Sequence, residues 1–195
     1  MNSIVRNISG YREIPPSDFR GAMRHLTGGV SVITAGRGGD ISGMTVTSVS
    51  SLSVDPPALI VSVNRSASSW PLLKRYGFFG VNILASDQID IAERFAGKGG
   101  LKGAERFAGA EWTVRASGVP LLVGALGAID CEVEEIVERH SHAIVIGRVL
   151  DVAVSARSAA LAYWHGQYVA IDQDEDALKL AEVGVPAARS GRRKF

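Results

Sequence analysis

The stretch that decides the fold is VSVITAGRGGDISGMTVTSVS, residues 30–50. Its first part, residues 30–35, is rich in β-branched side chains, which is typical of a strand. Residues 36–40 contain three glycines and an aspartate, and because glycine adopts positive φ at little cost, they predict a tight turn. A second strand is expected from residue 41 to about residue 50. Two strands joined by a short glycine turn indicate an antiparallel hairpin.

The rest of the chain predicts mainly β structure with a few short helices. Two consecutive prolines, Pro56 and Pro57, interrupt the chain after the hairpin, since neither fits inside a central strand. Ser17 or Asp18 is expected to cap the first helix and Ser86 a later one. Helices are expected at 17–26, 66–76, 86–95 and 174–183, and further strands at 58–63, 78–84, 126–137, 143–154 and 168–171. These strands do not alternate regularly with helices, which favours a closed or partly closed antiparallel barrel over a doubly wound sheet.

Composition limits the classes of function. The chain has 195 residues, 46% of them hydrophobic, which suggests one domain with apolar surface to spare for a homodimer interface. Lys and Arg number 21 against 20 for Asp and Glu, so no strong field attracts nucleic acid or a membrane surface. Cys131 is the single cysteine, which excludes an intrachain disulfide and predicts a small buried side chain. The sequence shows neither a secretory signal nor a spanning segment, so we expect a cytoplasmic protein.

Common catalytic signatures are missing from the sequence. It contains no dinucleotide-binding glycine fingerprint, no phosphate loop and no Gly-x-Ser-x-Gly elbow. His140 and His142 are two residues apart and would share one face of a strand. No carboxylate or cysteine cluster completes a metal site around them, so no metal site is predicted.

Hydroxyl residues concentrate in two places. In residues 43–53, GMTVTSVSSLS, seven of eleven residues are Ser, Thr or Gly. Small hydroxyls on a strand leave donors open to a flat ligand with polar edges. Ser66, Ser68 and Ser69 form a second cluster that opens a predicted helix, where free N–H groups attract phosphate. The alternative is that these residues merely occupy edge strands and helix caps, and composition alone favours that alternative.

Several sequence pieces, taken in order, identify a family. They are FR at 19–20, TGGVSVIT at 27–34, residues 43–53 with DPP at 55–57, residues 66–72, FGVNIL at 79–84, RFA at 94–96, FAG at 107–109, HAIVIGRV at 142–149 and residues 163–168. Together they resemble the flavin reductases that form the small component of two-component flavin monooxygenases. The resemblance covers about residues 19–171.

The resemblance implies a fold and an activity. It implies an antiparallel Greek-key split β-barrel of the FMN-binding type over residues 1–172, followed by a short helix and basic tail at 173–195. It implies a homodimer that reduces FMN or FAD with NADH or NADPH and supplies reduced flavin, by diffusion, to a flavin-dependent oxygenase component. This chemistry requires stacked rings and needs neither a nucleophile nor a metal.

The resemblance also implies roles for particular residues. His142 would serve the nicotinamide, with Tyr168 close to it. The residues implied to surround the flavin are Met44, Thr45, Val46, Thr47 and Ser48 at the ring edge, Ser62, Val63 and Asn64 at the ribityl chain, Ser68 and Ser69 at the phosphate, Arg94 and Phe95 on a neighbouring helix, and Ala125 and Leu126 near the ring. The chain departs from the family pattern at His140-Ser141, where Gly-Asp is common, and at His165, where arginine is common. Both departures concern the choice between NADH and NADPH.

Two other functions remain open from sequence. One is an electron carrier of the same fold that retains its flavin and reacts little with pyridine nucleotides. The other is a non-enzymatic barrel whose groove binds a protein partner. Bound flavin colour and turnover with free FMN distinguish the three.

Overall fold

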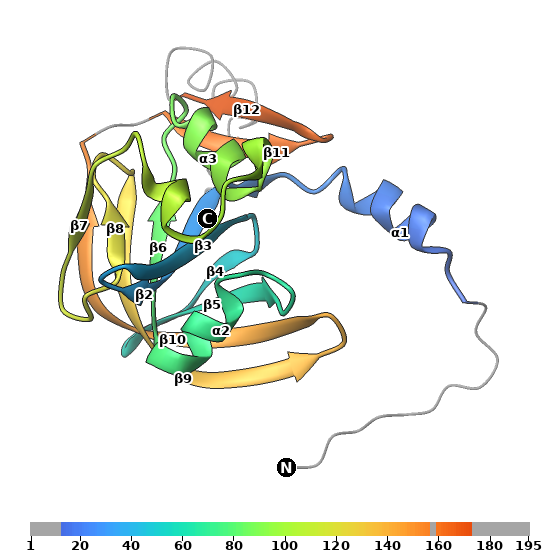
Figure 1. Ribbon diagram of the computed structural model, residues 1–195. Coiled ribbons are helices and arrows are strands. Elements are labelled where there is room, and N and C mark those ends of the chain that lie inside the picture. The colour runs from blue at the N-terminus through green and yellow to red at the C-terminus, as the bar shows by residue number, and fades with distance from the viewer. Residues whose placement is uncertain (1–12, 157–158, 173–195) are drawn as a thin grey trace, which may run out of the picture.

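The computed structural model describes residues 13–156 and 159–172 (Figure 1). The predicted helix at 174–183 and the whole tail at 173–195 lie outside the described residues. The rest is dominated by a curled antiparallel sheet with small helices around it. The predicted mainly β, partly closed antiparallel barrel is therefore confirmed.

The main sheet has seven strands in the order β3-β2-β6-β9-β10-β5-β4, all paired antiparallel. Their bounds are β2 Ser31–Arg37, β3 Asp40–Val46, β4 Val49–Val54, β5 Pro57–Asn64, β6 Phe78–Ile83, β9 Gly127–Arg139 and β10 His142–Val154. The edge strands β3 and β4 are consecutive in the chain, joined only by Thr47 and Ser48. The two edges of the sheet therefore approach each other at these residues without pairing, and the barrel is split there.

The hairpin predicted from residues 30–50 is present, but its second strand is shorter than expected. β2 and β3 pair from Ser31 with Val46 to Arg37 with Asp40. Gly36 has φ +92°, and a Cβ there would collide with the carbonyl oxygen of Asp40, so the turn requires glycine. The expected strand 41–50 is instead two strands, because the chain leaves β3 after Val46 and enters β4 at Val49.

The barrel interior is apolar and includes the single cysteine. Ile33, Val61, Phe79 and Val145 come from four different strands and are completely buried in one cluster. Cys131 belongs to the same cluster, which confirms its predicted burial. Burial raises the pKa of its thiol to about 12, so the side chain is a neutral apolar group.

Five short strands accompany the main sheet. β1 Gly28–Gly29, β11 Ala160–Trp164 and β12 Gln167–Ile171 form one small sheet, and β7 Trp112–Val114 pairs with β8 Pro120–Leu122. Only β12 was expected from the sequence. The others span two to five residues, too few for a clear alternation of buried and exposed side chains.

The helices are α1 Pro16–Met23, α2 Trp70–Tyr76 and α3 Ile89–Phe95, with 3₁₀ turns η1 Lys98–Gly100 and η2 Gly103–Phe107. Pro71 lies in the first turn of α2, as predicted. The predicted side-chain caps are wrong: Pro15 precedes α1, and α3 begins three residues after Ser86 with Gln88 at the cap position. α1 buries none of its residues and projects from the barrel (Figure 1).

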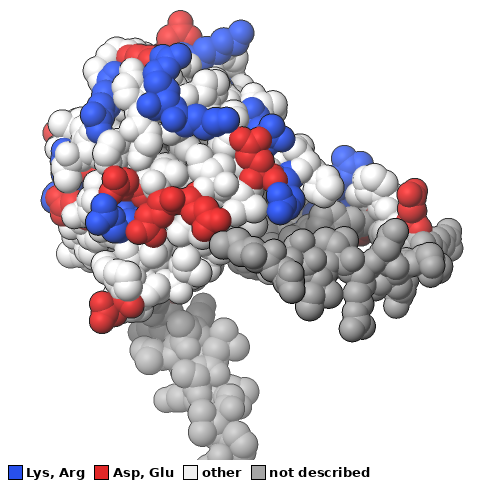
Figure 2. Space-filling model, turned by 90° about the horizontal axis from the view of Figure 1, so that it is seen from below, with Lys and Arg blue, Asp and Glu red and all other residues white. Residues whose placement is uncertain are grey.

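The visible surface carries charges of both signs. Figure 2 shows acidic and basic side chains intermixed on one face, with broad uncharged areas between them. Among the described residues, no helix is long and apolar enough to cross a membrane.

Candidate functional site

A large cavity lies where the barrel is split. It has a volume of about 690 Å³, within the range of small-molecule sites. Its walls come from the end of β3, the end of β5 with the loop that follows, the end of α3, the start of η2 and the first residue of β10. The lining residues are Met44, Thr45, Val46, Thr47, Ser48, Ser62, Asn64, Ser66, Ala67, Ser68, Phe95, Ala96, Lys102, Arg106 and His142.

Residues 44–48, which the sequence singled out, form one continuous wall. Within the described residues, β3 is an edge strand paired with β2 alone, so its other edge presents backbone N–H and C=O groups that no described strand takes. Two of the hydroxyls here are already committed, because Thr45 Oγ1 donates to the Ala92 carbonyl (2.6 Å) and Ser48 Oγ to the Ser62 carbonyl (2.8 Å). The wall therefore offers a ligand mainly backbone groups, because the hydroxyls of Thr45 and Ser48 are already bonded within the protein.

The end of β5 forms a second wall through alternate residues. Ser62 and Asn64 line the cavity, whereas Val63 is completely buried in the barrel core. This follows from the two-residue period of a strand, which places neighbouring side chains on opposite faces. Asn64 Oδ1 accepts hydrogen bonds from the N–H and the hydroxyl of Ser66 (2.9 and 2.8 Å), and so shapes the loop that continues the wall.

The two serines predicted to hold phosphate lie in different environments. Ser68 lines the cavity, and its hydroxyl shares a 2.8 Å hydrogen bond with that of Ser42 on β3. Ser69 is completely buried at the position before α2 and does not line the cavity. Its Oγ has no hydrogen-bond partner within the described residues, so this buried hydroxyl is unsatisfied.

Two cations at the same end of the cavity were missed from the sequence. Arg106 is fixed by three backbone carbonyls, donating to Leu101 and Gly43 (both 2.9 Å) and to Phe95 (3.3 Å). Lys102 precedes η2, where its N–H donates to the carboxylate of Glu105 (3.1 Å). Lys102 lies in the glycine-rich segment 97–103 and Arg106 lies just after it, where the sequence shows no hydrophobic periodicity. The one sequence feature that pointed to these cations was the four-residue spacing of two basic residues.

Three other predicted residues are not brought to this cavity. Arg94 lies beside Gly109, where a Cβ would be 3.2 Å from its Nη1. Ala125 is buried in an aromatic cluster with Phe107 and lines a different cavity. Leu126 follows it and donates its N–H to the Ile83 carbonyl (2.8 Å). By contrast Phe95 lines the cavity while its ring packs against Phe107 (5.0 Å between centroids).

His142 lies on the cavity wall and is held at its backbone and at one ring nitrogen. It opens β10, where it pairs with Asn64 of β5. Its Nδ1 shares a 2.8 Å hydrogen bond with the hydroxyl of Ser141. Within the described part of the chain Nε2 has no hydrogen-bond partner, and it is the nitrogen that a ligand can reach. This arrangement suits a hydrogen bond to a ligand more than a buried structural role.

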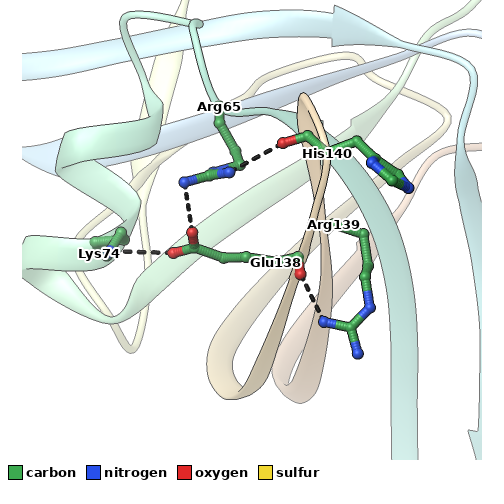
Figure 3. A network of polar contacts seen from close by, with 5 residues as sticks. All are labelled: Arg65, Lys74, Glu138, Arg139 and His140. Carbon is green, nitrogen blue, oxygen red and sulfur yellow. Dashed lines mark hydrogen bonds and ion pairs between the residues drawn. The ribbon is translucent and has the colours of Figure 1, made fainter.

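A polar network fastens the two segments that carry Asn64 and His142 (Figure 3). Arg65 donates through Nη1 to the His140 carbonyl (2.9 Å), and its Nη2 pairs with Glu138 (2.6 Å). Lys74 of α2 also pairs with Glu138 (3.2 Å). Each ion pair is partly exposed and stabilises little by itself. The Arg65 N–H also donates to the Ser141 carbonyl (3.0 Å), so backbone and side chain together fix the spacing of the two walls.

A smaller cavity of about 220 Å³ adjoins the first and contains Tyr168. The two cavities share Thr45, Val46, Thr47 and Ala96, so His142 and Tyr168 line adjoining cavities. Burial, together with nearby Glu93, raises the pKa of the Tyr168 hydroxyl above its usual value. Tyr168 is therefore a neutral hydrogen-bond donor at physiological pH.

These features define what the site can do. A free strand edge suits a flat ring with polar edges, and the end formed by Ser68, Lys102 and Arg106 suits an anion. Within residues 13–156 and 159–172, no group of three or more His, Cys, Asp or Glu could hold a metal ion. The geometry favours binding and orientation of a planar ligand with an anionic tail.

Comparison with known proteins gives consistent results. The family model described as "Flavin reductase like domain" matches residues 23–172. The chain is 35% identical over 156 residues to a flavin reductase of Pseudomonas putida, covering 80% of this chain and 89% of that protein. It is 38% identical over 151 residues to the FMN reductase (NADH) RutF of Stutzerimonas stutzeri, covering 77% and 86%. Among solved structures, the flavin reductase component BorF of a bacterial two-component tryptophan halogenase has a TM-score of 0.75 at 32% identity, covering 82% and 99%.

Proposed function

Since the chain belongs to the flavin reductase-like family and is an oxidoreductase, we propose that it is an NAD(P)H:flavin reductase that supplies reduced flavin to a partner monooxygenase. FMN or FAD, when bound, accepts a hydride at N5 from the nicotinamide C4. The observation that carries the proposal is the cavity at the split, with a free strand edge along one wall and two cations at one end.

The residues present fit a flavin. The free edge at the end of β3, with Thr47 and Ser48 that follow it, offers both donors and acceptors to the polar edge of an isoalloxazine ring. Ser62 and Asn64 lie where a ribityl chain would follow. Ser68 and Lys102, which line the cavity, would bind the phosphate. Arg106 contributes positive charge from a fixed position.

The protein's contribution is orientation. Backbone groups of β3 hold one ring edge, and His142, through Nε2, would hydrogen-bond the nicotinamide so that the two rings stack in reactive geometry. Tyr168, in the smaller adjoining cavity, would act as a neutral hydrogen-bond donor. No side chain is required to move a proton during hydride transfer. Arg94, Ala125 and Leu126, which lie away from the cavity, would act only by supporting its walls.

The site is built for reversible binding. Ser48, Asn64, Ser66, Ser68 and Lys102 are all exposed, so much of a bound flavin would remain near solvent. Such a site would hold flavin by a few hydrogen bonds and by the positive charge at one end of the cavity, without enclosing it. This supports flavin as a substrate that leaves after reduction, as a partner oxygenase in the same cytoplasm would require.

A homodimer is also part of the proposal. Phe19 (62% exposed) and Met23 (44%) lie on α1, which buries none of its own residues, and Leu26 (65%) follows three residues after its end. Apolar side chains at these exposures are typical of surfaces that another subunit covers.

The test is steady-state oxidation of NADH and of NADPH with and without added FMN. The proposal predicts turnover that depends on FMN and exceeds one equivalent of protein. A coloured protein that retains flavin and does not turn over added FMN would favour the electron carrier. A colourless protein with no FMN-dependent oxidation would favour the barrel that binds a protein partner.

A further inference from the structure

The sequence AERFAG occurs twice, at residues 92–97 and again at residues 104–109. The structure brings the two copies together, because the rings of Phe95 and Phe107 meet edge to face with 5.0 Å between their centroids. The glycine-rich segment 97–103 is therefore a short loop whose two ends lie close together. Its position depends on the contacts that the two copies make with it.

The glutamate of each copy makes one contact with the segment 97–103. Glu93 pairs with Lys98 (2.5 Å), and Glu105 accepts the N–H of Lys102 (3.1 Å). Both contacts lie at the surface, where water competes for the same groups and ion pairs stabilise little. These two contacts alone would leave the segment loosely held.

Arg106 makes the stronger connection. Its Nε donates to the Leu101 carbonyl (2.9 Å) within the segment, and its Nη1 donates to the carbonyls of Gly43 on β3 (2.9 Å) and Phe95 at the end of α3 (3.3 Å). The guanidinium is partly buried, and hydrogen bonds from a charged donor are roughly twice as strong as those between neutral groups. One side chain therefore joins the segment to the strand and to the helix.

This geometry requires an arginine. A guanidinium has N–H donors on three nitrogens in one rigid plane, so it can serve carbonyls that lie in different directions. The ammonium of lysine is a single point and cannot bridge them. Arg94, the equivalent arginine of the first copy, lies beside Gly109 and does not line the cavity at the split. The bridging therefore depends on where the fold places Arg106, and not on the hexapeptide itself.

The group that Arg106 holds leads directly into Lys102. The Leu101 carbonyl and the Lys102 N–H belong to one peptide unit, which is planar. Arg106 holds the carbonyl end of this unit and Glu105 holds the N–H end, so together they fix the direction in which the chain enters Lys102. Within the described residues the Lys102 ammonium forms no ion pair, and its side chain lines the cavity at the split.

We propose that Arg106 is a positioning residue, whose three hydrogen bonds anchor the segment 97–103 to β3 and α3 so that Lys102 stays at the anion-binding end of the cavity. The inference rests on the proposed function, because it takes the anion to be the flavin phosphate. Arg106 then sets FMN affinity through Lys102, and not through its own charge alone.

The test is a double-mutant cycle of Arg106→Lys and Lys102→Gln, with Arg75→Lys as the matched control. Lysine keeps the charge and the alkyl chain of Arg106 but cannot bridge the three carbonyls. Arg75 is an exposed arginine at the end of α2 that pairs with Asp40 (2.9 Å) and does not line the cavity. Fluorescence titration gives Kd for FMN and for riboflavin with each protein. Tryptic cleavage after Lys98 is followed in the flavin-free proteins.

We expect Arg106→Lys and Lys102→Gln each to weaken FMN binding by about fivefold, and the double variant to lose no more than about fivefold in total. Riboflavin has no phosphate and should bind all of these proteins equally. Trypsin should cut flavin-free Arg106→Lys after Lys98 about tenfold faster than the parent, because the loss of charge-assisted hydrogen bonds raises the population of the open segment. Arg75→Lys should match the parent in both assays.

Additive losses, which would reach about 25-fold in the double variant, would overturn the proposal, because Arg106 would then act independently of Lys102. An Arg106→Lys protein with the FMN affinity of the parent would overturn it as well. Cleavage spread through the barrel would also overturn it, since Arg106 would then be a general structural residue.

The cleavage assay separates this inference from the proposed function, because it uses no flavin. Faster cleavage after Lys98 in Arg106→Lys, with no FMN binding by any of the proteins, would support the anchoring by Arg106 and refute the proposed flavin site. Unchanged cleavage in an Arg106→Lys protein that binds and reduces FMN would refute the anchoring and leave the proposed function intact.

Discussion

Lys102→Gln should weaken FMN binding and leave riboflavin binding unchanged. Lys102 lies at the end of the cavity that also contains Ser68, and its N–H is fixed by Glu105. The side chain is exposed, so its attraction to a phosphate is screened by solvent and resembles a surface ion pair more than a buried one. We therefore expect a loss of about 1 kcal/mol, or about fivefold in Kd. Riboflavin has no phosphate and should bind both proteins equally.

Lys98→Gln is the matched control. Lys98 lies four residues earlier in the same glycine-rich segment, is also exposed, and pairs with Glu93 (2.5 Å) outside the cavity. The assay is fluorescence titration of FMN and riboflavin with each protein, at low salt and at high salt. The Lys102 effect should shrink as salt rises, because screening weakens exposed charge pairs. An equal loss for riboflavin, or an equal loss in Lys98→Gln, would refute the assignment of this end of the cavity to phosphate.

Four further outcomes are expected. Replacing both Ser68 and Ser69 by Ala should weaken FMN by about 1–3 kcal/mol in titrations, with riboflavin unaffected; a matched loss of riboflavin would remove both from the phosphate site. His142→Ala should raise KM for the reduced nucleotide or lower kcat by about tenfold, with flavin affinity and Tm nearly unchanged, and collapsed flavin binding with normal kinetics per bound flavin would contradict its role. The Cys131 thiol, with its pKa raised to about 12, should resist iodoacetamide near pH 9 until denaturant is added, and stability should fall as pH rises from about 9 to about 12, because the unfolded thiol ionises first. Sedimentation at micromolar concentration should show a dimer; a stable monomer of 20.6 kDa would refute it.

The long elements were predictable from sequence and the short ones were not. β9 and β10 each span thirteen residues, and both were found within a few residues of their ends. β11 has only five residues, and its strand conformation depends more on pairing with β1 and β12 than on its own sequence pattern. The caps failed for a related reason: the start of α3 depends on Gln88, whose Oε1 accepts the Ala85 N–H, and glutamine carries no cap signal.

Some residues of the candidate site were likewise predictable from the sequence, and others were not. Residues 44–48 stood out because a hydroxyl-rich strand is unusual, and the structure places all five on one wall. Val63 was predicted to contact the flavin together with its neighbours, but the alternation of side chains along the strand places it in the core. Arg106 could not be found, since its position depends on Gly43 and Phe95, which are distant in sequence and are brought together only by the fold.

Anaerobic stopped-flow mixing measures whether this protein catalyses hydride transfer to flavin. Protein with FMN is mixed with NADH or with NADPH, and the loss of visible flavin absorbance is followed together with nucleotide oxidation. We expect one flavin to be reduced for each nucleotide oxidised, at a rate far above that of the same mixture without protein. Reduction no faster than in the protein-free mixture, with both nucleotides, would contradict it.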